Sequence, residues 1–269
     1  MNSCDITPLL TYRTDRQMIT ARDTMGGLAK GLAVIETFSA DHPRQSIAQV
    51  ATASGLDRAT ARRCLLTLAH HGYADYDGKY FTLTPRVLRL GTACLAAMPL
   101  PQLVQPMLDR LSDALGESSS LSILDDTEIV YIARAAQRKV MSISLMPGSR
   151  LPAFCTSMGR VLLAALPEAE LRLRLARHPL QARTALTVTD PVMLLDRIAA
   201  ARVQGFAVID QEVELGLRSI AVPVMDVRGK VVAALNLGLP ALAEGVDTLA
   251  ARYLPALRSV QGELRKVLL

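Results

Sequence analysis

The sequence predicts an α+β protein of two domains: an N-terminal winged helix-turn-helix, and a C-terminal domain in which helices flank an antiparallel sheet. The length of 269 residues suggests about two domains. Two helical patterns, at 47–53 and 56–72, are joined by a tight turn and followed by a hairpin signal, which is the order of a winged helix-turn-helix. After residue 100, paired strand patterns alternate with helical ones, which is typical of an antiparallel-sheet α+β domain and not of a doubly wound fold.

The first two helices follow a polar N-terminal segment. Residues 1–24 show no sustained apolar period and are predicted to be a flexible arm. Apolar residues at helical spacing predict a helix over 27–39. Ser46 can N-cap the next helix, 47–53, through its hydroxyl.

The third helix is predicted at about 56–72, with Asp57 as its N-cap and Gly72 as its C-terminal stop. Ala61, Leu65 and Leu68 recur at helical spacing and form its inward face. Two short β-prone runs then flank Asp77-Gly78, a dipeptide that favours a hairpin turn. These features predict the recognition helix and the wing.

A helix over 85–98, closed by prolines at 99 and 101, marks the predicted domain boundary. We expect a helix-turn-helix domain at 25–84, a linker helix at 85–99 and a C-terminal domain at 100–269. The elements expected in the C-terminal domain are helices at 103–115, 158–165, 168–176, 191–205 and 242–268, the last with a candidate interruption at Pro255, and strands at 119–124, 128–133, 140–145, 206–210, 219–226 and 231–237.

Basic residues gather on the third helix and the wing. A formal net charge of +5 does not establish nucleic-acid binding by itself. Reading the major groove requires a helix with an apolar anchoring face and a small, polar or basic outer face. A solvated helix face explains most charge clusters as well, but the adjoining wing favours the DNA interpretation. The candidate DNA contacts are Ser46, Arg58, Thr60, Arg62, Arg63 and, at the tip of the wing, Lys79.

Other classes of function find little support in the sequence. The four cysteines are far apart and the four histidines lack a second ligand at metal spacing, so no disulfide framework and no metal site is predicted. Nucleophile-elbow, metalloprotease, P-loop and dinucleotide-binding motifs are absent, so we assign no catalytic residue and no cofactor. No apolar run reaches membrane-spanning length and no signal peptide is evident, so we expect a cytoplasmic protein without a membrane partner.

Three places in the C-terminal domain carry polar residues that suit a ligand. The segment 151–160 runs into a helix N-terminus, where backbone N–H groups and the hydroxyls of Thr156 and Ser157 suit an anion, although simple N-capping explains them equally well. Acidic residues at 210, 212 and 214 resemble a metal-binding cluster, but a solvated strand end with an internal ion pair is more common. Asn236 lies inside an apolar strand and needs a hydrogen-bond partner if it is buried.

Taken together, the chain from about 28 to 268 resembles an IclR-type transcriptional regulator. The stretches that carry the resemblance are SGLDRATARR at 54–63, FTLTPRVLRLG at 81–91, LPAFCTSMGRVLLAA at 151–165, GFAVIDQE at 205–212 and LGLRSIAVP at 215–223. The resemblance implies a GAF-like effector-binding domain, a dimer through the N-terminal half, and a dimer or tetramer overall. Transferred by position, the effector pocket falls at Ser157, Met158, Ile209 or Asp210, Ser219, Asn236 and Gly238, with Arg134 as the partner of an effector carboxylate, and the anion site adds Thr156 to these candidates. The chain departs from the family pattern at Ser157, Met158 and Asn236, so the effector itself is not transferred.

A closer similarity is to the subgroup that regulates aromatic-acid breakdown through the β-ketoadipate pathway. It rests on ARA at 133–135, MSIS at 141–144, GSRLP at 148–152 and DQE at 210–212. It implies protocatechuate, para-hydroxybenzoate or β-ketoadipate as effector. Two winged domains in a dimer would bind double-stranded DNA at a pseudo-palindromic operator, with half-sites about one helical turn or a multiple apart. Two alternatives stay open: a small-molecule sensor that acts through protein partners, and an enzyme acting on small aromatic acids.

Overall fold

The computed structural model describes residues 23–39, 41–137, 145–241 and 245–268. These residues form two compact units, 23–96 and 97–268, each with its own hydrophobic core. The predicted arm at 1–24 therefore lies almost wholly outside the described residues. The predicted strand at 140–145 does so as well, except for Leu145.

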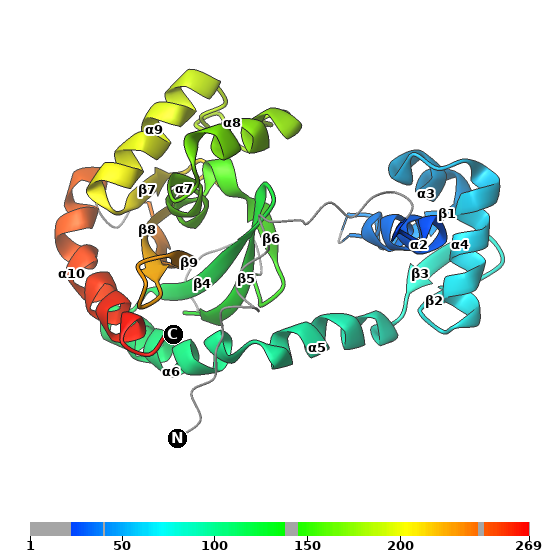
Figure 1. Cartoon of the computed structure of the whole chain (residues 1–269), viewed down its shortest axis with the longest axis horizontal. Helices are drawn as coiled ribbons and strands as arrows, with labels where there is room; N and C mark the ends of the chain where they lie inside the picture. The colour runs from blue at the N-terminus through cyan, green and yellow to red at the C-terminus, as the bar shows by residue number, and fades with distance from the viewer. Residues whose placement is uncertain (1–22, 40, 138–144, 242–244, 269) are drawn as a thin grey trace. The chain divides into compact units, whose positions relative to one another are not determined.

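The N-terminal unit consists of three helices, a small sheet and the start of a linker (Figure 1). Its elements are α2 (Gly26–Glu36), β1 (Arg44–Ser46), α3 (Ile47–Ser54), α4 (Arg58–His70), β2 (Ala74–Tyr76), β3 (Tyr80–Leu83), the single-turn η2 (Pro85–Val87) and α5 (Leu88–Ala97). Val34, Val50, Ala61, Leu65 and Phe81 are fully buried and bring the three helices and the hairpin onto one core. The predicted helix-turn-helix, its inward stripe and the hairpin are confirmed.

The wing has one strand more than the sequence predicts. β3 pairs antiparallel with both β2 and β1, which gives the order β1-β3-β2. β1 precedes α3 and is only three residues long. A strand this short shows no alternation of apolar and polar residues, so the sequence pattern does not reveal it.

The C-terminal unit is a six-stranded antiparallel sheet covered by helices on both faces. Its elements are α6 (Pro99–Leu115), β4 (Ser118–Asp125), β5 (Glu128–Ala135), β6 (Arg150–Pro152), the single-turn η3 (Ala153–Cys155), α7 (Ser157–Ala164), α8 (Glu168–Arg177), α9 (Pro191–Gln204), β7 (Ala207–Asp210), β8 (Leu217–Met225), β9 (Val231–Pro240) and α10 (Val246–Arg265). The strand order is β6-β5-β4-β9-β8-β7, which confirms the predicted α+β class.

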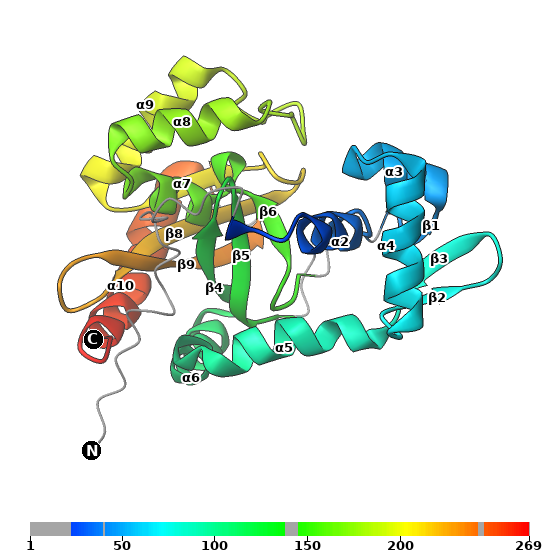
Figure 2. The same cartoon turned by 45° about the vertical axis from the view of Figure 1, so that its right-hand side comes forward.

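Alternate residues of β4 show which helix covers which face of the sheet. The Ser119 hydroxyl donates to the backbone of α6 at Leu108, whereas the Ser122 hydroxyl lies 3.1 Å from the sulfur of Met158 on α7. Because successive side chains of a strand project to opposite faces, α6 and α7 cover opposite faces of the sheet. Figure 2 shows the same arrangement, with α7, α8 and α9 on one side and α6 and α10 on the other.

The prolines end one helix as predicted, but two other predictions about them are wrong. The helix predicted over 85–98 ends at Ala97, directly before Pro99, whereas the next helix, α6, starts at Pro99 and not at residue 103. Proline is tolerated in the first turn of a helix because the N–H that it lacks has no intrahelical partner there. Likewise α10 continues through Pro255 without interruption.

Candidate nucleic-acid interface and ligand pocket

Capping hydrogen bonds fix the N-termini of α3 and α4, and Gly55 ends α3 at the turn between them. At α3, the backbone N–H of Gln49 donates to the Ser46 hydroxyl, and the Ser46 N–H donates to the Gln49 side-chain oxygen at 2.9 Å. At α4, the Asp57 carboxylate accepts from the Thr60 N–H at 2.8 Å. Gly55 between them has φ 68°, which glycine adopts without steric cost. The caps therefore fix the start of α4, and the Ser46 hydroxyl is already engaged in the capping of α3.

Three of the predicted DNA contacts, Arg58, Arg62 and Arg63, are exposed on α4. Within the described residues, their guanidinium groups make no hydrogen bond and no ion pair. Thr60 is half-buried, and with Arg63 it lines a groove of about 440 Å³ between α2 and α4. Cationic groups on an exposed helix that is anchored by a buried stripe can bind phosphates or base edges.

The wing presents Lys79 on a turn held by Asp77. The Asp77 carboxylate accepts hydrogen bonds from the N–H groups of Tyr80 at 2.8 Å and Lys79 at 2.9 Å, and it pairs with Arg44 from β1. These contacts, the Tyr80 N–H first, hold the pKa of Asp77 well below its ordinary value. The Lys79 ammonium lies 5.1 Å from the centre of the Tyr80 ring. The wing therefore displays a lysine on a rigid tip.

The predicted effector residues converge on one pocket between α7 and the sheet. Seven of the eight line it, and the exception is Asp210. The described residues that line the pocket are Tyr131, Arg134, Leu145, Leu151, Thr156, Ser157, Met158, Val213, Leu217, Ser219, Asn236 and Gly238. Its volume of about 20 Å³ has room for roughly one water molecule.

The register of the sheet explains why these polar residues meet. Ser120 on β4 lies opposite Arg134 on β5 and opposite Asn236 on β9. Directly opposed residues project from the same face, so the three side chains form a row that crosses three strands, roughly 10 Å from end to end. A register shift between β4 and β5 places Tyr131 opposite Ser122, on the same face as Arg134.

Arg134 and Tyr131 bring a cation and a neutral hydroxyl to the pocket. Nη1 of Arg134 donates to the Ser120 hydroxyl at 3.0 Å. Burial lowers the pKa of Arg134, and Tyr131 opposes that change, but a guanidinium remains charged at neutral pH. Burial raises the pKa of Tyr131 to about 12, so its phenol keeps a proton that it can donate. This pair suits an anionic ligand.

Hydroxyl and amide groups line the part of the pocket formed by α7, β8 and β9. The hydroxyl oxygens of Ser157 and Ser219 lie 2.8 Å apart. The side-chain oxygen of Asn236 is buried and has no hydrogen-bond partner within the described residues, so it can accept a hydrogen bond from a ligand hydroxyl. The Thr156 hydroxyl accepts from the Gly159 N–H at 3.0 Å, which supports the N-capping interpretation of this residue.

The acidic residues of β7 and the following loop have separate partners. The Asp210 carboxylate lies 2.5 Å from Nε of Arg218, and this hydrogen bond is the main cause of its lowered pKa. Glu212 is buried and pairs with Arg160 of α7 at 2.7 Å. The ion-pair interpretation thus holds for two of the three, and no group of three metal-ligating side chains occurs in the part of the chain that the structure describes. The pocket does not include Asp210, because β7 pairs it with Arg218, and these two residues project from the face of the sheet opposite to that of Ser219.

Five lining residues were not predicted: Tyr131, Leu145, Leu151, Val213 and Leu217. Four of them are aliphatic, and a sequence presents such residues as ordinary core. Tyr131 stands three positions before Arg134, so simple alternation would place the two on opposite faces. Only the register shift brings them to one face, and no local sequence signal marks it.

Two further observations bear on other classes of function. Within the described residues, no single helix is long and apolar enough to cross a membrane, and only the bent pair at 85–94 and 99–115 reaches that length and composition together. Burial raises the pKa of the Cys155 thiol to about 12, so at neutral pH it stays protonated and a poor nucleophile.

Comparison with known proteins gives a family match for each of the two units. The family profile described as IclR helix-turn-helix domain matches residues 27–78, and the profile described as bacterial transcriptional regulator IclR C-terminal matches 92–260. The chain is 46% identical over 243 residues to the Pca regulon regulatory protein of Pseudomonas putida, which covers 90% of this chain and 84% of that protein.

Two more similarities concern aromatic acids. The chain is 36% identical over 264 residues to the p-hydroxybenzoate hydroxylase transcriptional activator of Acinetobacter baylyi, covering 96% of this chain and 97% of that protein. Among solved structures, it is similar to an IclR homolog complexed with 4-hydroxybenzoate from Microbacterium hydrocarbonoxydans. That match has a TM-score of 0.72, 25% identity, and coverage of 90% of this chain and 99% of that one.

Proposed function

This chain belongs to the IclR family of transcriptional regulators, and we propose that it binds a hydroxylated aromatic acid in the pocket under α7 and so controls genes of aromatic-acid catabolism. The observation that carries this proposal is the row of Arg134, Ser120 and Asn236 on the face of the sheet that α7 covers. The row supplies a cation at one end and an amide at the other, which matches a ring that bears a carboxylate and a hydroxyl.

The chemistry of the pocket favours such a ligand over an apolar one. The Arg134 guanidinium can hold a carboxylate with two parallel hydrogen bonds. The buried oxygen of Asn236 requires a donor, which a phenolic hydroxyl provides. Among the candidate effectors, para-hydroxybenzoate and protocatechuate meet both requirements, whereas β-ketoadipate lacks the phenol. Two similar proteins support this choice. One is the p-hydroxybenzoate hydroxylase transcriptional activator of Acinetobacter baylyi, and the other is the IclR homolog complexed with 4-hydroxybenzoate.

We propose that α4 enters the major groove and that Lys79 of the wing contacts the backbone beside it. Arg58, Arg62, Arg63 and Thr60 supply the polar and basic face that such docking requires. A homodimer or tetramer would present two such helices to a pseudo-palindromic operator, with half-sites about one helical turn or a multiple apart. Regulation of this kind places the protein in the cytoplasm with the DNA, and no enzymatic activity is part of the proposal.

Thermal stabilisation by ligand tests the pocket. Purified full-length protein is heated with 4-hydroxybenzoate, protocatechuate, β-ketoadipate or benzoate, and the transition temperature is compared with that of the free protein. Arg134→Ala should abolish stabilisation by 4-hydroxybenzoate, whereas Arg177→Ala, at an exposed ion pair on α8, should retain it. Full stabilisation of the Arg134→Ala protein would refute the assignment.

A second variant tests the orientation of the ring. Asn236→Ala removes the proposed partner of the ligand hydroxyl, and one hydrogen bond of about 0.5–1.5 kcal/mol corresponds to a two- to twelve-fold change in affinity. We therefore expect 4-hydroxybenzoate to bind this variant about as weakly as benzoate does. If the variant still prefers 4-hydroxybenzoate over benzoate, the hydroxyl does not contact Asn236.

DNA binding is tested by fluorescence anisotropy with an operator fragment. Arg63→Ala should weaken binding and leave the affinity for the effector unchanged, and a lost phosphate contact should lower the slope of log K against log salt by about one. Arg172→Ala, whose side chain pairs with Glu168 on α8, is the matched control. Unchanged operator binding by Arg63→Ala would contradict the recognition-helix assignment.

Two results would favour the alternative functions. A sensor that acts only through protein partners would bind duplex DNA without a steep dependence on salt concentration. Turnover of the aromatic acid by the C-terminal unit would favour an enzyme.

A further inference from the structure

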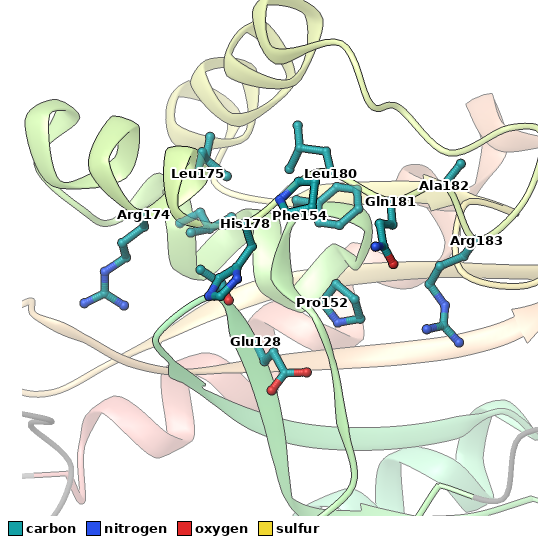
Figure 3. A pocket seen from close by; sticks show the side chains of 13 residues that line it. Glu128, Pro152, Phe154, Arg174, Leu175, His178, Leu180, Gln181, Ala182 and Arg183 are labelled. Carbon is teal, nitrogen blue, oxygen red and sulfur yellow. The ribbon is translucent and has the colours of Figure 1, made fainter. Parts of the chain in front are cut away.

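A second cavity in the C-terminal unit, with a volume of about 680 Å³, is separate from the pocket under α7. We name it the α8 cleft, because it lies between the end of α8 with the following segment 178–183 and the turn and edge formed by β5 and β6. Figure 3 shows His178, Gln181 and Arg183 directed from this segment toward Pro152 and Glu128. The two cavities share no lining residue. Its volume lies within the range of small-molecule sites.

One wall of the α8 cleft is apolar, and most of the charges around the cleft are already paired. Phe154 and Leu163 are buried in this wall, and Leu175 and Leu180 are partly buried beside them. Arg174 pairs with Glu170 at 2.6 Å, and Glu128 pairs with Arg150 at 2.7 Å. An apolar ring or chain can therefore pack here without separating an unpaired charge from water.

Arg183 is the exception among these charges. Its Nε donates to the Val213 carbonyl at 3.3 Å, and within the described residues its two terminal nitrogens have no partner. The bond through Nε holds the guanidinium at the cleft, with two donors left for a carboxylate. His178 and Gln181 add further polar groups on the same segment.

Hydrogen bonds join the segment behind this cleft to the wall of the effector pocket. Val213, which accepts from Arg183, lines the pocket under α7. The hydroxyls of Thr184 and Thr187 donate to the carbonyls of Gln211 at 2.8 Å and Glu212 at 2.6 Å. A molecule that displaces the segment after α8 therefore also displaces the loop that holds Val213.

We propose that the α8 cleft is a second small-molecule site, which binds an aromatic monocarboxylate through Arg183 and the Phe154 wall and is coupled to the effector pocket through Val213. The site stands on its own geometry, and only the coupling rests on the proposed function of the pocket. Because coupling between two sites is reciprocal, occupancy of the cleft changes the affinity of the pocket by the same factor as occupancy of the pocket changes that of the cleft.

The test uses ¹⁹F NMR of 3-fluoro-4-hydroxybenzoate bound to the full-length protein. We expect two bound resonances. Arg183→Gln and Ala182→Trp should each remove the same resonance, the first by removing the charge and the second by filling the cleft from an exposed position. Arg134→Ala should remove the other one, and Arg177→Ala on α8, outside the lining, should keep both. Circular dichroism of each variant checks that it folds.

The outcomes distinguish the proposed second site in the α8 cleft from the proposed effector pocket under α7. A single resonance that Arg134→Ala removes and both cleft variants keep would overturn the second site and leave the proposed function intact. A resonance that the cleft variants remove, with none removed by Arg134→Ala, would support the cleft and refute the pocket assignment. Coupling is measured with the Ala182→Trp variant and not with Arg183→Gln, because Ala182→Trp keeps both residues of the Arg183–Val213 hydrogen bond. Its pocket should bind 4-hydroxybenzoate with an affinity changed several-fold, and an unchanged affinity would overturn the coupling.

Discussion

Removal of the Glu212 carboxylate is expected to destabilise the C-terminal unit strongly. Glu212 and Arg160 form a buried ion pair whose side chains are 8% and 4% exposed. Their atoms Oε2 and Nη2 lie 2.7 Å apart, and the Val188 N–H donates to the same Oε2 at 3.1 Å. Nε of Arg160 donates to the Phe154 carbonyl at 3.0 Å. The pair thus joins α7 to η3, to the loop after β7 and to the segment before α9.

The magnitude follows from the charge that Glu212→Ala leaves behind. The Arg160 guanidinium stays buried with a single carbonyl partner, and breaking a buried pair in this way costs about 3–5 kcal/mol. A domain of this size loses about 2–4 °C per kcal/mol, so its transition temperature should fall by about 6–20 °C. The double variant Arg160→Met with Glu212→Leu removes both charges and should recover most of the loss.

Differential scanning calorimetry of the full chain measures these shifts. Glu168→Ala is the matched control, because Glu168 forms an exposed ion pair with Arg172 on α8, and it should give no resolvable shift. If Glu212→Ala moves the transition by no more than the control does, the pair does not hold these elements together. If the double variant is no more stable than the single one, the loss does not come from an uncompensated buried charge.

Three further predictions concern a close approach, a titrating ion pair and a helix cap. A Cβ at Gly159 would lie 2.0 Å from the backbone of η3, so Gly159→Ala should destabilise by at least about 1–3 kcal/mol in chemical denaturation. Gly262→Ala on α10, where the added carbon meets nothing within 4 Å, should instead stabilise by about 0.5–1 kcal/mol. Arg218 lowers the pKa of Asp210 below its ordinary value of 3.8, so the stability from this pair is complete above about pH 4 and is lost as the pH falls through the lowered pKa. The difference in transition temperature between wild type and Asp210→Asn should therefore shrink in acid, and a difference independent of pH would contradict this reasoning. Ser46→Ala should cost the N-terminal unit about 1 kcal/mol in its thermal transition without changing effector binding.

The helix-turn-helix could be predicted from the sequence because its signals are local. A cap acts within three residues, as at Ser46 and Asp57, and a buried helical stripe repeats every three or four. Asp77-Gly78 specifies its turn through the two residues themselves. Each of these interactions involves residues that are close in the sequence, so a short stretch of chain is enough to predict it.

The parts that the sequence did not predict depend on partners far along the chain. Asp210 projects from the face of the sheet away from the pocket, because the register of β7 and β8 places it opposite Arg218 and places Ile209 opposite Ser219. Tyr131 reaches the pocket through a register shift between two strands. The residues that line the α8 cleft come from several segments between 127 and 183. In the sequence, most of them look like ordinary core or surface residues. Family resemblance located six of the pocket residues and the helix N-terminus signal located Thr156, but only the register of the strands explains why the residues of the sheet meet.

The small volume of the effector pocket has a consequence for regulation. A cavity of about 20 Å³ does not admit an aromatic ring, so binding must displace one of its walls. The strands are held by their ladders, and α7 is held by the Arg160–Glu212 pair and by the close approach at Gly159. The loop that carries Val213 also holds Glu212, so it is joined to α7 by this pair and to the segment after α8 by the hydrogen bonds of Arg183 and Thr184. A ligand shifts a conformational equilibrium only through its difference in affinity between two arrangements. Because the closed pocket excludes the ring, the effector favours an arrangement in which a wall is displaced, and the contacts of the Val213 loop would carry that displacement to α7 and to the segment after α8.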